Sequence, residues 1–312
     1  MCTSLALPAP NGAHLFGRTL DLDAHFGESV TLTPRRYPFT FDGCPPLPRH
    51  YALLGMATVM DSPAARGYPL YAEAMNEAGL CMAGLRFSES AAYVDPAAPA
   101  EGKLTLAPWE LIPYLLGQFS TLEEVRAALG QIRVVNRPFS TALPAAPLHW
   151  HMADADPTHG GLILEVTSEG MRLYDADAGV LTNEPPYPAQ LASLQAAPDR
   201  LPGDYDSTAR FTRAATLRRW WLERGSTCGA GDGTPQTTDY AVAQFFSLLG
   251  AVSPTAGAVM TKDGCCHRTL YTCCMDTAAG SYSYKTERDA AVRSVGFGAL
   301  DLNGDRVVAV EG

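Results

Sequence analysis

Alternation of apolar and polar residues along the chain predicts a protein built mainly from short β-strands. In His14–Leu22, every second side chain falls on one face of a strand, because successive strand residues point to opposite faces. Asn76–Gly79 and Ser168–Gly170 each separate two apolar runs, as hairpin turns do, and Asn303-Gly304 is a further turn signal. The other segments with a strand pattern are Val30–Thr33, Tyr51–Val59, Leu70–Ala74, Leu80–Phe87, Leu162–Val166, Met171–Tyr174, His267–Met275 and Ser281–Lys285.

Apolar residues spaced three and four positions apart predict helices between these strands. Thr121 and Glu124 form a capping box, and Gly130 is expected to end the helix that they begin. Pro185–Asp206 is expected to be a loop. A solvated helix face is expected to carry Arg213, Arg218, Arg219 and Arg224. The remaining expected helices are Pro113–Phe119, Ser207–Arg224 and Asp239–Leu249.

The order of strands, helices, strands, helices and strands favours an α+β architecture in which helices cover β-sheets. We find no linker composition and no internal repeat, so residues 1–312 are interpreted as one domain. With 46% hydrophobic and 18% charged residues, the chain has an ordinary globular composition and enough length for a sizeable core.

Charge and terminal sequence exclude several classes of protein. The formal net charge is −10, from 23 Lys and Arg against 33 Asp and Glu, which disfavours binding to nucleic acid. No signal peptide is recognisable, and the longest uncharged run, Tyr240–Met260, is broken by polar residues, Gly and Pro. The expected protein is cytoplasmic, without a membrane partner, and its eight cysteines are expected to stay reduced.

Cys2 is the first candidate for chemistry. If Met1 is removed, Cys2 becomes the N-terminal residue and combines a thiol nucleophile with an α-amine that can take its proton. A cysteine can also stand at position 2 by accident, so position alone does not decide between the two interpretations. The following strand does favour chemistry, because it places Arg18 and Asp21 among apolar residues. Buried charges need partners of opposite charge. A thiolate can be the partner of Arg18, and an N-terminal ammonium can be the partner of Asp21.

Short motifs continue in order through essentially the whole chain. They are Met1–Thr3, Phe16–Asp21, Thr33–Arg35, Met75–Leu80, Ala83–Leu85, Leu148–Trp150, Val180–Asn183, Gly203–Asp204, Ala209–Phe211 and Arg268–Thr272. Each motif is weak alone, but together with Cys2 they are specific. The sequence resembles the choloylglycine hydrolase family, whose members are N-terminal-nucleophile amide hydrolases that include conjugated bile salt hydrolases and penicillin V acylases.

This resemblance implies a four-layer αββα sandwich with antiparallel sheets, in which residue 1 is removed on maturation. It implies that Cys2 is the nucleophile and that its α-amine is the general base. Arg18 and Asp21 match the pair that tunes the thiol and holds the amine. Asn183 matches the oxyanion-hole asparagine, and Arg210 matches a second arginine near the nucleophile.

Departures from the family pattern concern the substrate site. Arg86 stands where the family usually has Asn or Tyr; it could donate to the oxyanion, bind a substrate carboxylate or sulfonate, or pair with Glu77 or Glu89. Leu22 stands where bile salt hydrolases usually have an aromatic residue. We assign Arg86, Leu22 and Phe26 to substrate binding. The chain between residues 183 and 210 is shorter than in typical family members, which leaves little room for the long hairpin that interlocks the family's tetramers. The sequence therefore does not decide whether the protein forms a homo-oligomer.

The expected reaction is hydrolysis of a linear, non-peptide amide through a Cys2 thioester, with no metal or organic cofactor. The expected substrate is an amphiphile, most readily a glycine- or taurine-conjugated bile acid. Penicillin V, an acyl-homoserine lactone or another N-acyl amide is the alternative. A hypothesis of a different class is a non-catalytic metal-binding protein using Cys265, Cys266, Cys273 and Cys274. Adjacent cysteines on a strand point to opposite faces, which favours packed thiols instead.

Overall fold

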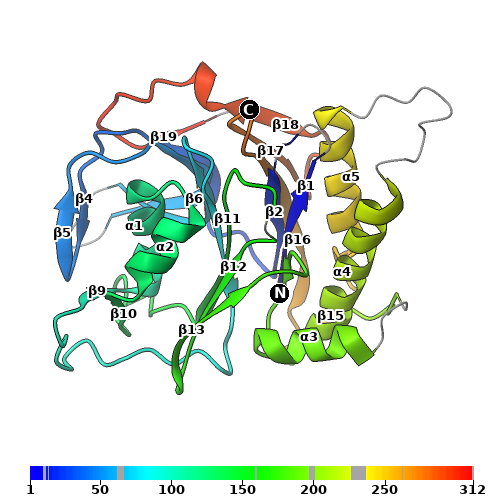
Figure 1. The fold of residues 1–312 in the computed structure, drawn as a ribbon, viewed down its shortest axis with the longest axis horizontal. Helices are drawn as coiled ribbons and strands as arrows, with labels where there is room; N and C mark the ends of the chain where they lie inside the picture. The colour runs from blue at the N-terminus through cyan, green and yellow to red at the C-terminus, as the bar shows by residue number, and fades with distance from the viewer. Residues whose placement is uncertain are drawn as a thin grey trace.

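The computed structural model contains two antiparallel β-sheets packed face to face, with helices on both outer faces (Figure 1). It describes residues 1–9, 12, 14–61, 67–158, 160–196, 201–225, 237–261 and 263–310. Both main sheets are antiparallel throughout, so the expected αββα sandwich is confirmed.

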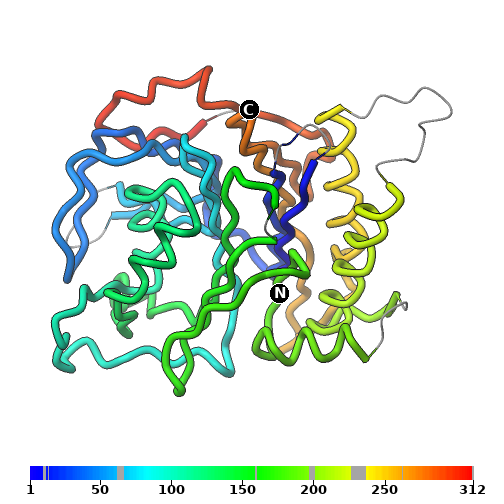
Figure 2. The backbone as a smooth tube through the Cα atoms, viewed as in Figure 1, coloured from blue at the N-terminus to red at the C-terminus, as the bar shows by residue number. Residues whose placement is uncertain are grey.

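The first sheet carries the N-terminus. Its strand order is β14-β1-β2-β16-β17-β18, and β15 pairs with β16. The bounds are β1 (Cys2–Pro8), β2 (His14–Leu22), β14 (Val180–Leu181), β15 (Val259–Met260), β16 (Cys266–Asp276), β17 (Ser281–Thr286) and β18 (Arg293–Gly296). β1 is an inner strand: β2 pairs with it along its whole length from Cys2 to Pro8, and β14 pairs with Ser4 and Leu5 on the other side. Figure 2 shows how the N-terminal strand runs beside the green segment that contains β14.

The second sheet has the order β13-β12-β11-β8-β7-β6-β3-β19. Its bounds are β3 (Ser29–Thr33), β6 (Leu53–Met60), β7 (Tyr68–Asn76), β8 (Cys81–Arg86), β11 (Leu148–Ala153), β12 (Leu162–Thr167), β13 (Gly170–Asp175) and β19 (Val308–Ala309). Two small pairs lie outside it: β4 (Phe39–Phe41) with β5 (Cys44–Leu47), and β9 (Leu104–Leu106) with β10 (Ile132–Val134).

Two apolar cores hold these layers together. One lies between the sheets and continues under α4 (Ser207–Arg224) and α5 (Thr238–Gly250). The other lies between the second sheet and α1 (Leu111–Gln118) and α2 (Leu122–Leu129). α3 (Tyr187–Ala196) lies beside α4, and short 3-10 turns occupy η1 (Pro108–Glu110) and η3 (Phe297–Ala299). No helix in the described part of the chain is both long and apolar enough to cross a membrane.

The capping box is confirmed, because the backbone nitrogen of Glu124 donates to the Thr121 hydroxyl and begins α2. The prediction of Pro113 as a helix start is wrong, since α1 already begins at Leu111. The prediction of a loop over Pro185–Asp206 is also wrong, because this segment contains α3. Its first backbone nitrogen, at Tyr187, donates to the Glu165 carboxylate from β12, a tertiary contact that no local pattern reveals.

Two further predictions need correction. The turn at Asn303 does not join paired strands, because β18 and β19 belong to different sheets. The arginines of α4 do not all lie in solvent: Arg213 and Arg218 are buried. Arg213 donates to the carbonyl of Ala251 and Arg218 to that of Ala6, so backbone acceptors replace water around both guanidinium groups.

Candidate active site

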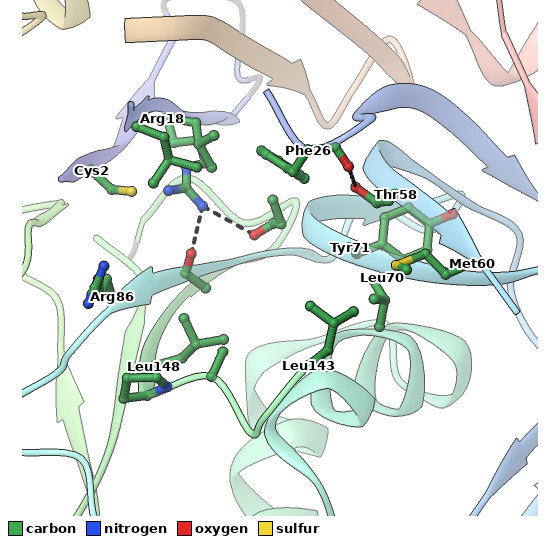
Figure 3. A pocket seen from close by; sticks show the side chains of 16 residues that line it. Cys2, Arg18, Phe26, Thr58, Met60, Leu70, Tyr71, Arg86, Leu143 and Leu148 are labelled. Atoms are coloured by element: carbon green, nitrogen blue, oxygen red, sulfur yellow. Dashed lines mark hydrogen bonds between the residues drawn. The ribbon is translucent and has the colours of Figure 1, made fainter. Parts of the chain in front are cut away.

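Cys2 begins β1, and its thiol opens onto a large cavity. Backbone pairing with β2 holds Cys2 opposite Leu20. Only 4% of Cys2 is exposed, and it lies at one end of a cavity of about 530 Å³ (Figure 3). A thiol in this position can meet a bound molecule while it stays largely shielded from water.

Apolar side chains make up most of the cavity wall. In the view of Figure 3, Cys2, Arg18 and Arg86 lie at one end of the cavity, while Met60 and Tyr71 lie at the other. The apolar lining residues are Leu20, Leu22, Phe26, Met60, Leu70, Tyr71, Ala72, Leu143, Ala146, Pro147 and Leu148. Leu22 and Phe26, both predicted to contact substrate, are therefore placed on the wall. Because burial of apolar surface contributes about 25 cal/mol per Å², the cavity favours a large apolar group.

The backbone nitrogen of Cys2 lies in a polar corner between Asn183 and Asp21. It donates a hydrogen bond of 2.8 Å to Oδ1 of Asn183. The amino group of Met1 donates to the carbonyl oxygen of Asp21 at 2.6 Å. Burial lowers the pKa of the Met1 amino group, although Cys2 and Asp21 act in the opposite direction. An amine in this corner is therefore desolvated and releases its proton more readily than one in water.

Arg18 lies beside Cys2, at the cavity wall, and its side chain is 1% exposed. One terminal nitrogen, Nη1, donates to the carbonyl oxygens of Gly84 at 2.6 Å and Ala72 at 3.3 Å. The other, Nη2, has no hydrogen-bond partner among the described residues. Burial alone would lower the pKa of Arg18, but Cys2, Tyr271 and Glu73 outweigh it and the pKa is raised. Arg18 is thus a permanently charged cation next to the thiol.

The carboxylate of Asp21 points away from Arg18, since residues three apart on a strand face opposite sides. It accepts hydrogen bonds from Thr269 at 2.7 Å and Thr19 at 3.2 Å. Burial raises the pKa of Asp21, and the nearby Arg210 partly offsets this effect. The hydrogen bond between Asp21 and the N-terminus runs through the Asp21 backbone carbonyl, not through its carboxylate.

Asn183 and Arg210 form a hydrogen-bonded unit around Cys2. Nη2 of Arg210 donates to Oδ1 of Asn183 at 2.8 Å, and Nη1 donates to the Cys2 carbonyl and to the Thr3 hydroxyl. These contacts leave the amide nitrogen of Asn183 as the donor group, and it contacts the carbonyl of Arg86 at 2.9 Å. A side-chain amide has two N–H donors, so one remains for a ligand beside the thiol.

Arg86 ends β8 and is exposed. Its Nε donates to the Ser88 hydroxyl at 2.6 Å, and within the described ranges it forms no ion pair. The predicted pairing with Glu77 is not seen, because Glu77 pairs with Arg35. Pairing with Glu89 is likewise absent among the described side chains. The guanidinium is therefore available to an anionic ligand.

A second cavity, of about 620 Å³, lies against the same site, and most of its lining residues are polar or charged. Arg86 lines both cavities, and so connects the apolar space beside Cys2 to a charged one. The lining residues of this polar cavity are Met1, Asp23, Arg86, Ser88, Glu89, Asn183, Glu184, Ser207, Arg210, Thr261, Asp263, Cys265 and His267. The two cavities together can hold an amphiphile with its apolar part in the cavity beside Cys2 and its charged part in the second cavity, past Arg86.

The structure brings together the five residues predicted to be catalytic, which are Cys2, Arg18, Asp21, Asn183 and Arg210. Sequence reasoning missed Thr3, which holds Arg210, and Glu73, a buried carboxylate behind Arg18. The sequence feature that could have pointed to Glu73 is its position as the one acidic residue inside the apolar run Leu70–Ala74.

The cysteines proposed as metal ligands do not form a site. Cys273 and Cys274 are buried in β16, whereas Cys265 is exposed. Across the described part of the chain, no group of three or more His, Cys, Asp or Glu side chains is arranged to hold a metal ion. Cys228 lies outside the described residues.

Comparison with known proteins gives a family match over nearly the whole chain. A model described as linear amide C–N hydrolases, choloylglycine hydrolase family, matches residues 2–198 and 195–310. The bile salt hydrolase/transferase of Lactiplantibacillus plantarum is 35% identical over 335 residues, which cover 99% of this chain and 96% of that protein. The conjugated bile acid hydrolase of Lactobacillus gasseri is 31% identical over 326 residues, with 99% of each chain covered.

Solved structures agree with this match. The C2A mutant of the conjugated bile acid hydrolase from Clostridium perfringens superposes with a TM-score of 0.88 at 29% identity, covering 100% of this chain and 97% of that one. The penicillin V acylase from Agrobacterium tumefaciens has a TM-score of 0.76 at 22% identity, covering 98% and 90%, and so shares the fold.

Proposed function

The chain belongs to the choloylglycine hydrolase family of linear amide C–N hydrolases, and on this premise we propose that it cleaves conjugates of a large apolar acyl group with a small acidic amine. Glycine- or taurine-conjugated bile acids are the substrates that fit this description best. The observation that carries the proposal is the position of Cys2, at one end of a mainly apolar cavity of about 530 Å³ that shares Arg86 with a second cavity lined mainly by polar residues. The names of the bile acid relatives support the same substrate class.

In the proposed reaction, the Cys2 sulfur attacks the amide carbonyl carbon after Met1 has been removed. The α-amine of Cys2 takes the thiol proton as the carbon–sulfur bond forms. It then passes this proton to the departing amine as the carbon–nitrogen bond breaks, which leaves an acyl thioester. A water molecule, deprotonated by the same amine, attacks the thioester and releases the acid and the free thiol.

Asn183 is proposed to stabilise the oxyanion of both tetrahedral intermediates, together with a backbone N–H. Its oxygen is occupied by Cys2 and Arg210, which turns the amide N–H group outward as a fixed donor. A donor that is already oriented costs no reorganisation during the reaction, and losing one typically costs about 10²–10³ in rate. Arg18 is proposed to favour the thiolate, and Asp21 and Arg210 to hold the N-terminal corner.

Arg86 is proposed to bind the carboxylate or sulfonate of the leaving amine. It is exposed, it forms no ion pair among the described residues, and it lines both cavities. A planar guanidinium also matches the geometry of an acidic oxygen pair.

Replacing Arg86 by glutamine is expected to raise KM for glycine- and taurine-conjugated substrates roughly fivefold, the upper end of what an ion pair of an exposed side chain contributes, with little change in kcat. The measurement is steady-state kinetics with glycocholate and with its glycine methyl ester, a neutral matched substrate. The ester should be unaffected. An equal loss of kcat on both substrates would show instead that Arg86 donates to the oxyanion.

The test of the whole proposal is product release from glycocholate, taurocholate and penicillin V by purified protein. We expect the bile acid conjugates to have the higher kcat/KM, because their acyl group fills more of the apolar cavity. Preference for penicillin V would reassign the substrate. Hydrolysis of none of the three would refute the substrate class.

A further inference from the structure

Glu73 is a carboxylate enclosed between the two sheets. It belongs to β7 and is 0% exposed, in a stretch whose other residues are apolar. Unpaired charges are very costly in such a place, so its surroundings must supply compensating groups. Glu73 does not line either cavity beside Cys2, and it takes no direct part in the proposed reaction.

Four groups from the facing sheet compensate the carboxylate. Tyr271 of β16 and Tyr282 of β17 each donate a hydroxyl hydrogen bond of 2.7 Å to Glu73, one to each oxygen. Nε of Arg18 in β2 lies 3.8 Å from the same carboxylate. Cys273 of β16 also contacts it, as a thiol donor. Burial keeps the pKa values of Tyr271, Tyr282 and Cys273 well above their usual range, so these groups stay neutral. Burial also raises the pKa of Glu73, and Arg18 and the three donors oppose this effect.

Arg18 therefore has the Glu73 carboxyl group and the Cys2 thiol as neighbours. Its Nε donates to the carbonyl of Thr19 at 3.1 Å and lies 3.8 Å from Glu73, whereas Cys2 lies by the cavity (Figure 3). Its Nη1 is used by backbone carbonyls, and its Nη2 is buried without a hydrogen-bond partner among the described residues. Within the described residues, Glu73 is the carboxylate that pairs with Arg18.

We propose that Glu73 is a positioning residue that moderates the influence of Arg18 on the Cys2 thiolate, an inference that rests on the proposed function of Cys2. When both are ionised, Glu73 and Cys2 compete for one guanidinium, so each weakens the stabilisation of the other. The benefit is chemical, because the nucleophilicity of a thiolate falls as its pKa falls. A lone Arg18 would produce more thiolate but a weaker nucleophile.

The test is the pH dependence of Cys2 alkylation in the Glu73→Gln variant. Glutamine keeps the shape of the side chain and removes its charge. Initial rates of alkylation by iodoacetamide are followed for the Cys2 peptide by mass spectrometry. The pH midpoint should fall by about one unit relative to the unmodified protein, as expected when one charge close to a titrating group is removed. Alkylation at low pH should accelerate several-fold, while kcat for the hydrolysed amide falls.

An unchanged midpoint would mean that Glu73 is only structural, and a rise would mean that it holds Arg18 in place rather than opposing it; either result overturns the proposal. Alkylation needs no substrate, so this test stands even if no substrate is turned over. If Glu73→Gln does not fold, Glu73→Asp is tested instead. Aspartate is one methylene shorter, so its charge lies farther from Arg18, and the pH midpoint of Cys2 alkylation must fall by a smaller, measurable amount. No change, or a rise, would again refute the proposal.

Glu110 provides a matched control. It is also 0% exposed, and its Oε2 lies 3.6 Å from Nη1 of Arg137, but it lines neither cavity beside Cys2. Glu110→Gln removes a buried charge from an arginine in the same way. It should leave the midpoint of Cys2 alkylation unchanged, because its partner does not face the thiol.

Discussion

Replacing Cys2 by serine is expected to reduce kcat for the hydrolysed amide by at least about 10³-fold. Loss of a catalytic nucleophile costs up to about 10⁶ in other hydrolases. The proposed attacking atom is a thiolate stabilised by Arg18, and a serine hydroxyl does not ionise under the same conditions. The measurement is steady-state hydrolysis of glycocholate, with N-terminal sequencing to verify that Met1 is removed from both proteins.

The loss must be chemical rather than structural. Serine differs from cysteine by one atom, so the thermal unfolding temperature of the Cys2→Ser variant should stay within a few degrees of that of the unmodified protein. The C2A mutant of the Clostridium perfringens relative has a fold similar to that of this chain. Cys44→Ser, a substitution of a half-buried thiol between β5 and β9, should keep full activity. Turnover by Cys2→Ser above about one tenth of the normal rate would contradict a cysteine nucleophile.

The elements that sequence patterns predict well are those decided by neighbours along the chain. The hairpin around Asn76–Gly79 and the capping box at Thr121 depend on residues within a few positions of each other. The helix α3 was missed because its apolar residues make no regular stripe. Its start depends on Glu165, more than 20 residues earlier in the chain.

The site shows the same division. Position and motif identify Cys2, Arg18 and Asn183, because a nucleophilic thiol, a permanent cation and an amide donor can each be recognised from residue type alone. The strand pattern places Glu73 inside an apolar run, but it does not tell which side chains contact its carboxylate. The side chains that contact Glu73 come from the other sheet. One of them, Tyr271, is nearly 200 residues away from Glu73 in the sequence. Pairing across sheets is thus the part of the site that one sequence does not reveal.

Protein that retains a residue ahead of Cys2 is expected to be inactive, with kcat lower by about 10²–10⁴, the usual contribution of a general base. The experiment uses an N-terminal fusion whose cleavage leaves Cys2 as the first residue. Turnover is measured before and after cleavage, with intact mass to follow the terminus. As a control, Cys2 should react with iodoacetamide in both forms, which shows that the thiol is accessible. Equal turnover in the two forms would exclude the α-amine as the base.

The reason lies in what the Cys2 nitrogen is before and after removal of Met1. In the full chain it is a peptide N–H that donates to Asn183, and its lone pair is delocalised into the preceding carbonyl, so it cannot accept a proton. Once freed, the same nitrogen is an amine in a corner where burial lowers the pKa of the Met1 amino group. A lowered amine pKa increases the neutral, proton-accepting fraction at pH 7. Activity should therefore rise with pH through a midpoint below the ordinary α-amine value of about 8.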